Sequence, residues 1–215
     1  CKKERSWNNS KTKRSFFFII VKKIIFFSHN DNKIKEVKKL FKETGINILT
    51  LHDFPNMLEP KETGSSFEEN AKIKSSYGYE KLKLPCFADD SGICISALNY
   101  FPGVESKRFL EKNGDHEKTF RTIINKAKEL SDFHAYFQTS VSLTFNNEVI
   151  AFKGVVNGKI SHEPRGKYGF HYDPIFIPEG SEETFGEMSI EEKNKISHRA
   201  CAINKLKKFL MKSLN

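Results

Sequence analysis

Cysteine is scarce in this chain of 215 residues, and the cysteines are widely spaced. They are Cys1, Cys86, Cys94 and Cys201, and no two of them form a C-x-x-C pair. Metal-thiolate clusters and dense disulfide frameworks both depend on closely spaced cysteines, so the sequence argues against either. Free thiols are typical of a reducing compartment, and we therefore expect a cytoplasmic protein.

Long apolar runs are also missing. A membrane-spanning helix takes about 20 apolar residues, whereas the run from Phe16 to Val21 has six. No small-residue cleavage site follows this run, as a secretory signal peptide requires. We expect no membrane partner, and we treat residues 1–21 as a basic tail outside the fold. The tail has two explanations: a targeting peptide or, the one that we favour, residues upstream of a start at Val21.

The positive charge is unevenly distributed. A formal net charge of +9 would suit a nucleic-acid-binding protein. However, residues 1–23 hold eight Lys and Arg and one acid, whereas the other 192 residues hold 28 basic and 26 acidic residues. The body of the protein is nearly balanced in charge, so we expect no nucleic-acid partner.

Hydrophobic periodicity predicts an α/β fold with a mixed sheet. Internal repeats and long Gly/Ser linkers are absent, which indicates one folded unit over residues 22–215. Strands are predicted at 24–28, 46–50 and 86–88, and a long hairpin over 135–145 and 148–160 that turns at Asn146-Asn147.

Helical spacing and capping residues predict five helices. The first two cover residues 32–41 and 67–82, the second with a break or kink near Gly78. Asp115 is a suitable N-cap for a third helix. A fourth begins at a capping box of Ser189 and Glu192, and Ser197 can cap the last.

A polar segment lies between the first predicted strand and the first predicted helix. Unpaired backbone N–H groups and the positive end of a helix dipole meet at such a turn, which suits phosphate. The glycines and the Lys-Ser/Thr pair of a Walker A loop are absent, so an ordinary polar turn is the alternative. The candidate phosphate-binding residues are Ser28, His29, Asn30, Asp31, Asn32 and Lys33.

Carboxylates gather in the following part of the chain. Asp89 and Asp90 follow an apolar stretch and precede Ser91-Gly92, which we expect to form a turn. Neighbouring carboxylates repel, so a divalent ion or a proton usually accompanies them, and magnesium prefers such oxygen ligands. An ordinary turn or helix cap is the alternative. Glu62 is a further candidate, whereas Glu68-Glu69 suits the solvated first turn of a helix.

Two later segments could recognise a nucleobase. An aromatic loop bounded by Gly and Pro could stack on a base and bond its edge, although loop aromatics also serve as packing. A basic stretch follows, in which two cations at a helix N-terminus oppose the dipole. Such local disagreement often marks a functional site. The candidates are Phe170, His171, Tyr172, Asp173, Lys193, His198 and Arg199.

Taken together and in this order, the segments resemble the inosine triphosphate pyrophosphatase family, the non-canonical purine NTP pyrophosphatases. The resemblance runs from about Lys22 to Leu210. It rests on Ser28-His29-Asn30-Asp31-Asn32-Lys33, Glu62-Thr63-Gly64, Phe67-Glu68-Glu69-Asn70-Ala71, Ala88-Asp89-Asp90-Ser91-Gly92, Phe101-Pro102-Gly103-Val104, Glu163-Pro164-Arg165-Gly166, Gly169-Phe170-His171-Tyr172-Asp173-Pro174-Ile175-Phe176, Thr184-Phe185-Gly186-Glu187-Met188 and Glu192-Lys193-Asn194-Lys195-Ile196-Ser197-His198-Arg199-Ala200.

The resemblance implies a two-lobed α/β fold around a long mixed sheet, with the active-site cleft between the lobes. It implies a homodimer that requires Mg²⁺ and hydrolyses ITP, dITP or XTP to the monophosphate and pyrophosphate. Asp90 would be the general base, and Glu62, Asp90 and the nearby Asp89 would form the metal site. Lys74 would approach the phosphates.

The same resemblance distributes the substrate contacts. Residues 28–33 would hold the triphosphate, and Ser91 would touch the substrate. The base would be read by Phe170, His171, Tyr172, Asp173, Lys193, His198 and Arg199. Two departures stand out: the family usually has Gly where His171 stands, and Lys107 and Arg108 follow a motif that differs from the common bacterial one. Which of these two meets the substrate stays open.

Three rival interpretations remain from the sequence. The closest is a related pyrophosphatase for other modified nucleotides. Another is a basic nucleic-acid-binding protein that uses the tail and the loop aromatics. The third is an inactive relative with a structural role. A panel of nucleotide substrates with detection of pyrophosphate tests the first rival. The second predicts steeply salt-dependent binding to duplex or single strands that persists without magnesium.

Overall fold

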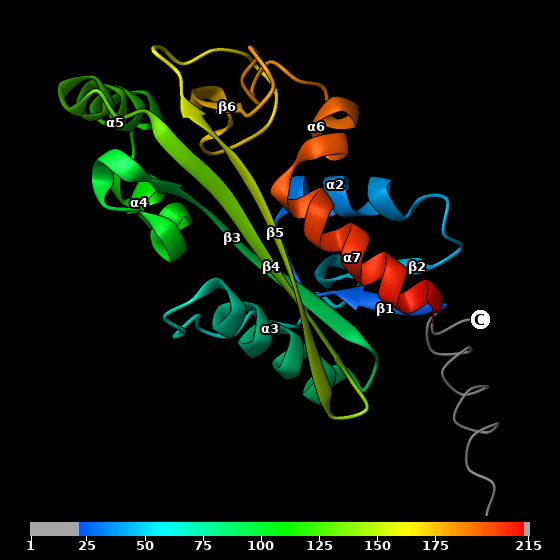
Figure 1. Cartoon of the computed structure of the whole chain (residues 1–215). Helices are drawn as coiled ribbons and strands as arrows, with labels where there is room; N and C mark the ends of the chain where they lie inside the picture. Colours follow the sequence, from blue (N-terminus) through cyan, green and yellow to red (C-terminus); the bar gives the residue numbers. More distant parts are fainter. Residues whose placement is uncertain (1–21, 213–215) are drawn as a thin grey trace, which may run out of the picture.

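A mixed sheet of six strands organises the molecule (Figure 1). The computed structural model describes residues 22–212, so the basic tail predicted for residues 1–21 lies outside the described residues. The strand order is β2-β1-β3-β4-β5-β6. The parallel strands are β1 (Lys23–Phe26), β2 (Asn47–Thr50) and β3 (Cys86–Ile95). The antiparallel part continues from β3 into β4 (His134–Phe145), β5 (Glu148–Ile160) and β6 (Phe176–Pro178).

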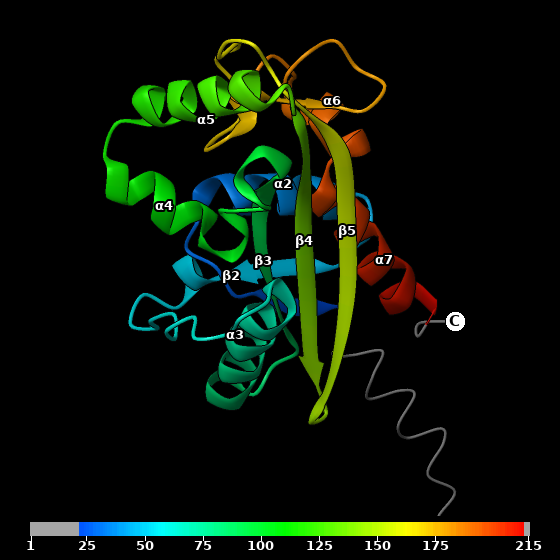
Figure 2. The ribbon, with the colours of Figure 1, turned by 60° about the vertical axis from the view of Figure 1, so that its left-hand side comes forward.

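Helices cover both faces of the sheet, and two more lie at its far end (Figure 2). Helices α2 (Asp31–Phe41) and α7 (His198–Lys212) pack on one face, and α3 (Phe67–Leu82) packs on the other. At the far end are α4 (Ser106–Asn113) and α5 (His116–Leu130), and α6 (Ile190–Ile196) leads into α7. Short 3₁₀ turns are η1 (Leu51–Asp53), η2 (Ser96–Leu98), η3 (Gly103–Glu105) and η4 (Asp173–Ile175).

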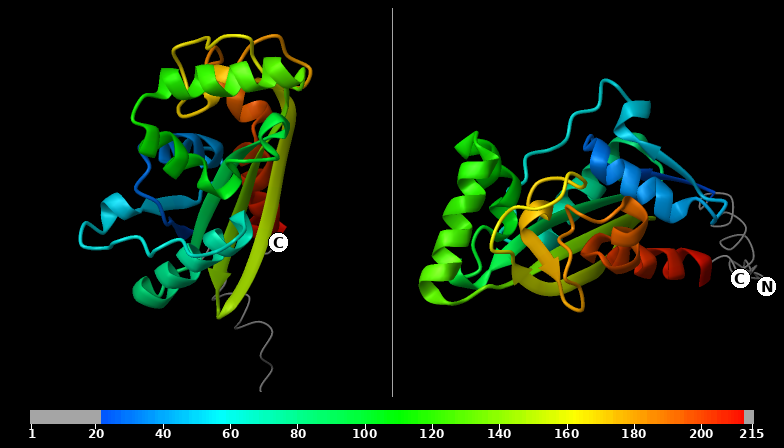
Figure 3. Two further views of the ribbon diagram at one scale, coloured as in Figure 1. Left: turned by 90° about the vertical axis from the view of Figure 1, so that its left-hand side faces the viewer. Right: turned by 90° about the horizontal axis from the view of Figure 1, so that it is seen from above.

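The long strands join two lobes (Figure 3), and the hydrophobic core is divided between the two ends of these strands. At one end, α4, α5 and β6 enclose a cluster that includes Ile93, Ile95 and Phe120. At the other end, α2 and α7 cover a second cluster on one face of β1 and β3, and α3 covers a third on the opposite face. The predicted two-lobed α/β fold is therefore confirmed.

Local signals placed most elements correctly. The predicted hairpin turns at Asn146 and Asn147, which have φ of +50° and +62°, as its two-residue turn requires. Asp115 caps α5 through the N–H of Lys118. The capping box of Ser189 and Glu192 begins α6, and Ser197 Oγ accepts from the N–H of Ala200 at the start of α7.

Two local predictions are wrong, both at glycines. Helix α3 runs unbroken through Gly78, where an added Cβ would lie 2.5 Å from Cys86 Sγ and from the ring of Phe27. Ser91 and Gly92 form no turn, because both pair with β4 inside a continuous β3. A Cβ on Gly92 would lie 2.2 Å from the carbonyl oxygen of Gly103. Each glycine allows close packing of neighbouring elements rather than a bend.

Between residues 22 and 212, no helix combines the length and the apolar character that crossing a bilayer demands.

Candidate active site

The site forms along an edge of β3 that has no neighbouring strand. Strand β1 pairs with β3 only at Ile25–Cys86 and Phe26–Phe87, and then the chain turns into α2. Beyond this point β3 continues as Asp89-Asp90-Ser91-Gly92, between the apolar residues of the two lobes. The polar middle of an otherwise apolar strand thus borders the space between the lobes.

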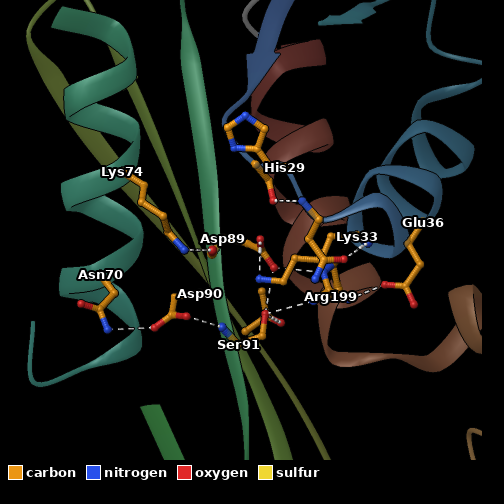
Figure 4. A network of polar contacts seen from close by, with 12 residues as sticks. His29, Lys33, Glu36, Asn70, Lys74, Asp89, Asp90, Ser91 and Arg199 are labelled. Carbon is orange, nitrogen blue, oxygen red and sulfur yellow. Dashed lines mark hydrogen bonds and ion pairs between the residues drawn. The ribbon is translucent and has the colours of Figure 1, made fainter. Parts of the chain in front are cut away.

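Strand alternation sends the two aspartates to opposite faces of β3 (Figure 4). Asp89 and Ser91 point toward α2 and α7, on the side where Phe87 packs. Asp90 points toward α3, on the side where Ala88 packs. Both side chains are buried, with 1% and 6% of their surface exposed. Two adjacent carboxylates therefore have separate environments.

Asp89 is held by cations. Its Oδ1 lies 3.0 Å from Lys33 Nζ, its Oδ2 lies 3.0 Å from Arg199 Nε, and Ser91 Oγ donates to Oδ2 at 2.8 Å. Burial alone would raise the pKa of Asp89, but Lys33 and Arg199 outweigh it and hold the pKa well below its ordinary value. Asp89 is thus a permanent anion that fixes the side chains of a lysine and an arginine.

A buried ion-pair chain continues from Arg199 toward the aromatic loop. Arg199 Nη1 contacts Glu36 Oε2, and Lys193 Nζ lies 2.9 Å from Glu36 Oε1. Lys193 Nζ also donates to Asp173 Oδ2 at 2.6 Å, and the N–H of Phe170 donates to the same oxygen at 2.7 Å. The alternating charges compensate one another where water is excluded. The chain joins α2, α6 and α7 to the loop that carries Phe170.

Asp90 has a different set of partners. Its Oδ2 accepts from Asn70 Nδ2 at 3.0 Å, and its Oδ1 accepts from the N–H of Ser91 at 3.0 Å. Burial raises the pKa of Asp90 above its ordinary value; the Lys74 and Lys33 charges oppose this shift, and the charge of Glu62 adds to it. Asp90 is thus a carboxylate with an increased affinity for a proton, which suits a general base.

Lys74 connects α3 to the open edge of β3. Its Nζ donates to the Asp89 carbonyl oxygen at 2.7 Å and to Glu62 Oε1 at 2.6 Å. Burial would lower the pKa of Lys74, but the charges of Asp90 and Glu62 raise it above the ordinary value, so this lysine stays charged. Asn70 and Lys74 lie four residues apart and therefore share one face of α3.

The turn before α2 is organised as the sequence predicts. Asn30 caps α2, because its Oδ1 accepts from the N–H of Lys33 at 3.0 Å. The N–H of His29 donates to Glu59 Oε1 at 2.8 Å. A carboxylate oxygen of the protein thus accepts a hydrogen bond from the backbone of this turn. Asp31 faces away and contacts His52 at 2.8 Å.

Aromatic rings form the opposite wall. His198 stacks on Phe137 with ring centroids 4.5 Å apart and an interplanar angle of 7°. Burial, then the charges of Arg199 and Lys193, lower the pKa of His198 well below its ordinary value, so the imidazole is neutral. Phe170 has Lys193 Nζ at 4.8 Å from its ring centre.

These parts surround one groove of about 520 Å³ between the lobes. Most predicted site residues line it, whereas Asp31, Asn32 and the side chain of Asp89 do not. Tyr172 lines the groove and also belongs to the core of one lobe, and its hydroxyl donates to the Ser106 carbonyl at 2.9 Å. Both Lys107 and Arg108 reach the groove. The lining residues are Ser28, His29, Asn30, Lys33, Glu59, Pro60, Glu62, Lys74, Asp90, Ser91, Gly92, Val104, Ser106, Lys107, Arg108, Glu111, Phe137, Phe170, His171, Tyr172, Asp173, Lys193, His198 and Arg199.

The three carboxylates suggested as metal ligands do not converge. Within residues 22–212, no group of three His, Cys, Asp or Glu side chains is arranged to hold a metal ion. The reason is the alternation of β3, which turns Asp89 away from the side occupied by Glu62 and Asp90. A metal in this groove would therefore rest on two carboxylates and on ligands that come from the substrate.

Sequence reasoning missed several residues around the site, and three of them hold its side chains in place. Glu36 looks like a solvated residue of an amphipathic helix, yet it compensates Lys193 and Arg199. Asn70 orients Asp90 and also accepts from the N–H of Gly64 at 2.8 Å. Phe137 supports His198 from the middle of β4. Only Asn70 carried a signal, since it belongs to the motif Phe67-Glu68-Glu69-Asn70-Ala71.

Comparison with known proteins identifies relatives over nearly the whole described chain. The model of the Ham1 family matches residues 24–209. The dITP/XTP pyrophosphatase of Christiangramia forsetii is 37% identical over 190 residues, which are 88% of this chain and 100% of that protein. The dITP/XTP pyrophosphatase of Bacillus subtilis is 37% identical over 192 residues, 88% of this chain and 97% of that protein.

Solved structures agree with this result. A HAM1 protein from Coxiella burnetii superposes with a TM-score of 0.79 at 36% identity, over 88% of this chain and 98% of that one. The Ham1 protein of Staphylococcus aureus gives a TM-score of 0.78 at 36% identity with the same coverage. The fold is thus similar over nearly the whole described chain.

Proposed function

The chain belongs to the Ham1 family and is a pyrophosphatase of non-canonical purine nucleoside triphosphates, and we propose that its active site is the groove beside β3. The observation that carries this proposal is the meeting of Lys33, Lys74, Glu62 and Asp90 in one groove. Substrates of the dITP and XTP type carry a polyanionic chain, and the N-terminus of α2 together with the two lysines suits its phosphates.

The triphosphate lies on the turn before α2 in this proposal. The N–H of His29, which now donates to Glu59, would donate to a phosphate oxygen. Lys33 and Lys74 offset the charge that develops on the leaving pyrophosphate. Asp89 does not touch the substrate here: it positions Lys33 and Arg199, which differs from the metal-ligand role first expected for it.

We propose Mg²⁺ as the cofactor, held by Glu62 and Asp90 together with phosphate oxygens of the substrate. The donors fit, because both are hard carboxylate oxygens and both line the groove. When bound, the ion would neutralise phosphate charge and acidify nearby water. Asp90, which Asn70 orients, accepts the proton of the water that attacks the α-phosphorus.

His198 is the residue best placed to read the purine. Its Nδ1 is buried and has no hydrogen-bond partner within the described residues, whereas the donors of Arg199 already serve Glu36, Asp89 and Ser91. A donor at this position would meet the 6-oxo group of hypoxanthine or xanthine. Adenine presents an amino group there, and an unpaired buried donor costs about 1–3 kcal/mol. Guanine also has a 6-oxo group, so this contact does not reject GTP.

We further propose a cytoplasmic homodimer without nucleic-acid or membrane partners. The free thiols of Cys86, Cys94 and Cys201 support a reducing compartment. The exposed aromatic pair Tyr100 and Phe101 supports an interface with a second copy, since neighbouring large apolar side chains at a surface favour association.

Release of pyrophosphate tests the function directly. The protein is assayed with dITP, XTP and ITP beside ATP, GTP and a modified pyrimidine triphosphate, with Mg²⁺ and with EDTA. We expect Mg²⁺-dependent release that is fastest with the three non-canonical purines. Preference for the modified pyrimidine would support a different nucleotide pyrophosphatase, and no release from any nucleotide would contradict the assignment of the groove.

A further inference from the structure

His171 has an unfavourable backbone conformation in the wall of the groove. Its φ is +53°, in the left-handed region that glycine adopts without strain and that a bulky residue rarely enters. The loop is held there by Asp173, which accepts from the N–H of Phe170. Strained residues that persist in a site commonly serve the site. The side chain, rather than the backbone, therefore needs an explanation.

The surroundings of the His171 ring are cationic. The ring packs edge-on against Phe170, with centroids 4.9 Å apart. The charged groups with the largest effect on its pKa come from four helices and are basic: Lys33 of α2, Lys107 of α4, His116 of α5 and Arg199 of α7. Three of them also have a carboxylate partner, which is Asp89 for Lys33, Glu111 for Lys107 and Glu36 for Arg199. Lys33, Lys107 and Arg199 line the same groove as His171. A convergence of basic groups from separate elements is the arrangement that binds a polyanion.

We propose that the imidazole of His171 contacts the triphosphate of the substrate and takes up a proton from solvent when the triphosphate binds. This inference rests on the proposed location of the nucleotide in the groove. It assigns His171 to the phosphate side of the substrate rather than to the base, where the resemblance would put it. The imidazolium formed in this way adds one more charged donor to Lys33 and Lys107.

The electrostatics of the free protein agree with this role. Burial, followed by the charges of Lys33, Lys107 and Arg199, lowers the pKa of His171 to about 4, so the ring is neutral near neutral pH. Bound phosphate oxygens compensate those cations and favour the protonated ring. The pKa is then higher in the complex than in the free protein, so the gain in affinity is complete below the pKa of the free protein and is lost as pH rises through the pKa of the complex.

Calorimetry measures this proton directly. The α,β-imido analogue of dITP, which resists hydrolysis between these phosphates, is bound to the Mg²⁺-loaded protein in buffers of different ionisation enthalpy. At about pH 6.5 we expect the native protein to take up more protons per bound analogue than His171→Asn. We also expect the variant to bind the analogue about tenfold more weakly, the usual effect of losing one charged hydrogen bond. The difference in affinity should shrink at about pH 8.5.

Asparagine is the matched replacement because it tolerates positive φ, so the loop conformation and the melting temperature should be retained. His134→Asn removes an exposed imidazole outside the groove and should leave proton uptake unchanged. The terminal phosphate of the analogue also titrates, but it does so equally in every protein compared. His171→Gly shows whether relief of backbone strain alone changes affinity.

Binding of a second ligand tests whether His171 contacts the triphosphate or the base. With dIMP, which lacks the β- and γ-phosphates, native protein and His171→Asn should show the same proton uptake. Equal uptake by the two proteins with the imido analogue would overturn the proposal, as would an equally large difference with dIMP. If the native protein neither binds the analogue nor hydrolyses dITP, the proposed function fails instead.

Discussion

Asp89 and Asp90 are neighbours in the chain, yet their pKa values are shifted in opposite directions. Lys33 and Arg199 hold the pKa of Asp89 far below its ordinary value, whereas burial and the charge of Glu62 raise that of Asp90. The difference arises because adjacent side chains of a strand point to opposite faces. One carboxylate is suited to organising cations and the other to accepting a proton.

Substitution of Asp90 tests this division of roles. We expect Asp90→Asn to reduce kcat for dITP at least about a hundredfold, because the amide cannot accept a proton from water. The protein should stay folded, since the amide has nearly the shape of the carboxylate and its oxygen can still accept one of the two hydrogen bonds that Asp90 accepts, from Asn70 or from the N–H of Ser91. Steady-state release of pyrophosphate and circular dichroism measure the two effects.

Glu68→Gln is the matched control for Asp90→Asn. Glu68 is an exposed acid in the first turn of α3 and does not line the groove. We expect its replacement to leave kcat unchanged. Near-normal turnover by Asp90→Asn would show that Asp90 is not the general base. The proposed location of the active site in the groove would still stand.

Individual site residues were predictable where the chain itself places them together. Asp89 and Asp90, and the polar run before α2, are visible as local patterns. Glu36 is not, because its partners Lys193 and Arg199 lie more than 150 residues away and meet it only after α2, α6 and α7 have packed. A buried acid on an amphipathic helix looks the same in sequence as a solvated one.

At the scale of elements, the sequence predicted the helix caps and the hairpin turn correctly, but it did not predict the structural role of two glycines. Capping by Asp115 and the turn at Asn146-Asn147 depend on a few neighbouring residues, which the sequence displays directly. Gly78 and Gly92 have ordinary backbone angles inside a helix and a strand, and what they permit is contact with distant atoms. The sequence does not show which elements approach them.

Replacement of Gly78 separates helix propensity from packing. Propensity alone predicts that Gly78→Ala stabilises α3 by about 1 kcal/mol. The structure predicts the opposite, because the new Cβ would lie 2.5 Å from Cys86 Sγ and from the ring of Phe27. We expect the free energy of unfolding to fall by about 1–3 kcal/mol, as in other overpacked cores. Urea denaturation measures it.

Glu80→Ala serves as the control in the same helix. Glu80 is exposed, so its replacement should change the free energy of unfolding by less than about 0.5 kcal/mol. A Gly78→Ala protein more stable than the native one would show that α3 packs less closely on β1 and β3 than the structure indicates.

At the scale of the whole molecule, the site exists because two lobes share the long strands. Apolar residues at both ends of β3 are buried by different sets of helices, which leaves the polar middle between them. The open edge of β3 then faces the turn before α2 from one side and α4 from the other. The sequence predicted the lobes through the resemblance, but α4 went unpredicted because its eight residues carry only a short apolar pattern.

Charge at the same scale leads to a last prediction, which concerns the rival interpretation as a nucleic-acid-binding protein. Residues 1–21 hold six Lys and Arg and one acid, and the family model matches only from residue 24 onward. A chain that begins at Lys22 should therefore hydrolyse dITP with unchanged kcat and KM.

Any binding of the full chain to duplex DNA should be steeply salt-dependent and should disappear with residues 1–21. The matched control is the full chain with those six basic residues replaced by Gln, which should also lose DNA binding. Salt-dependent binding that persists in both variants would show that the folded body itself binds nucleic acid.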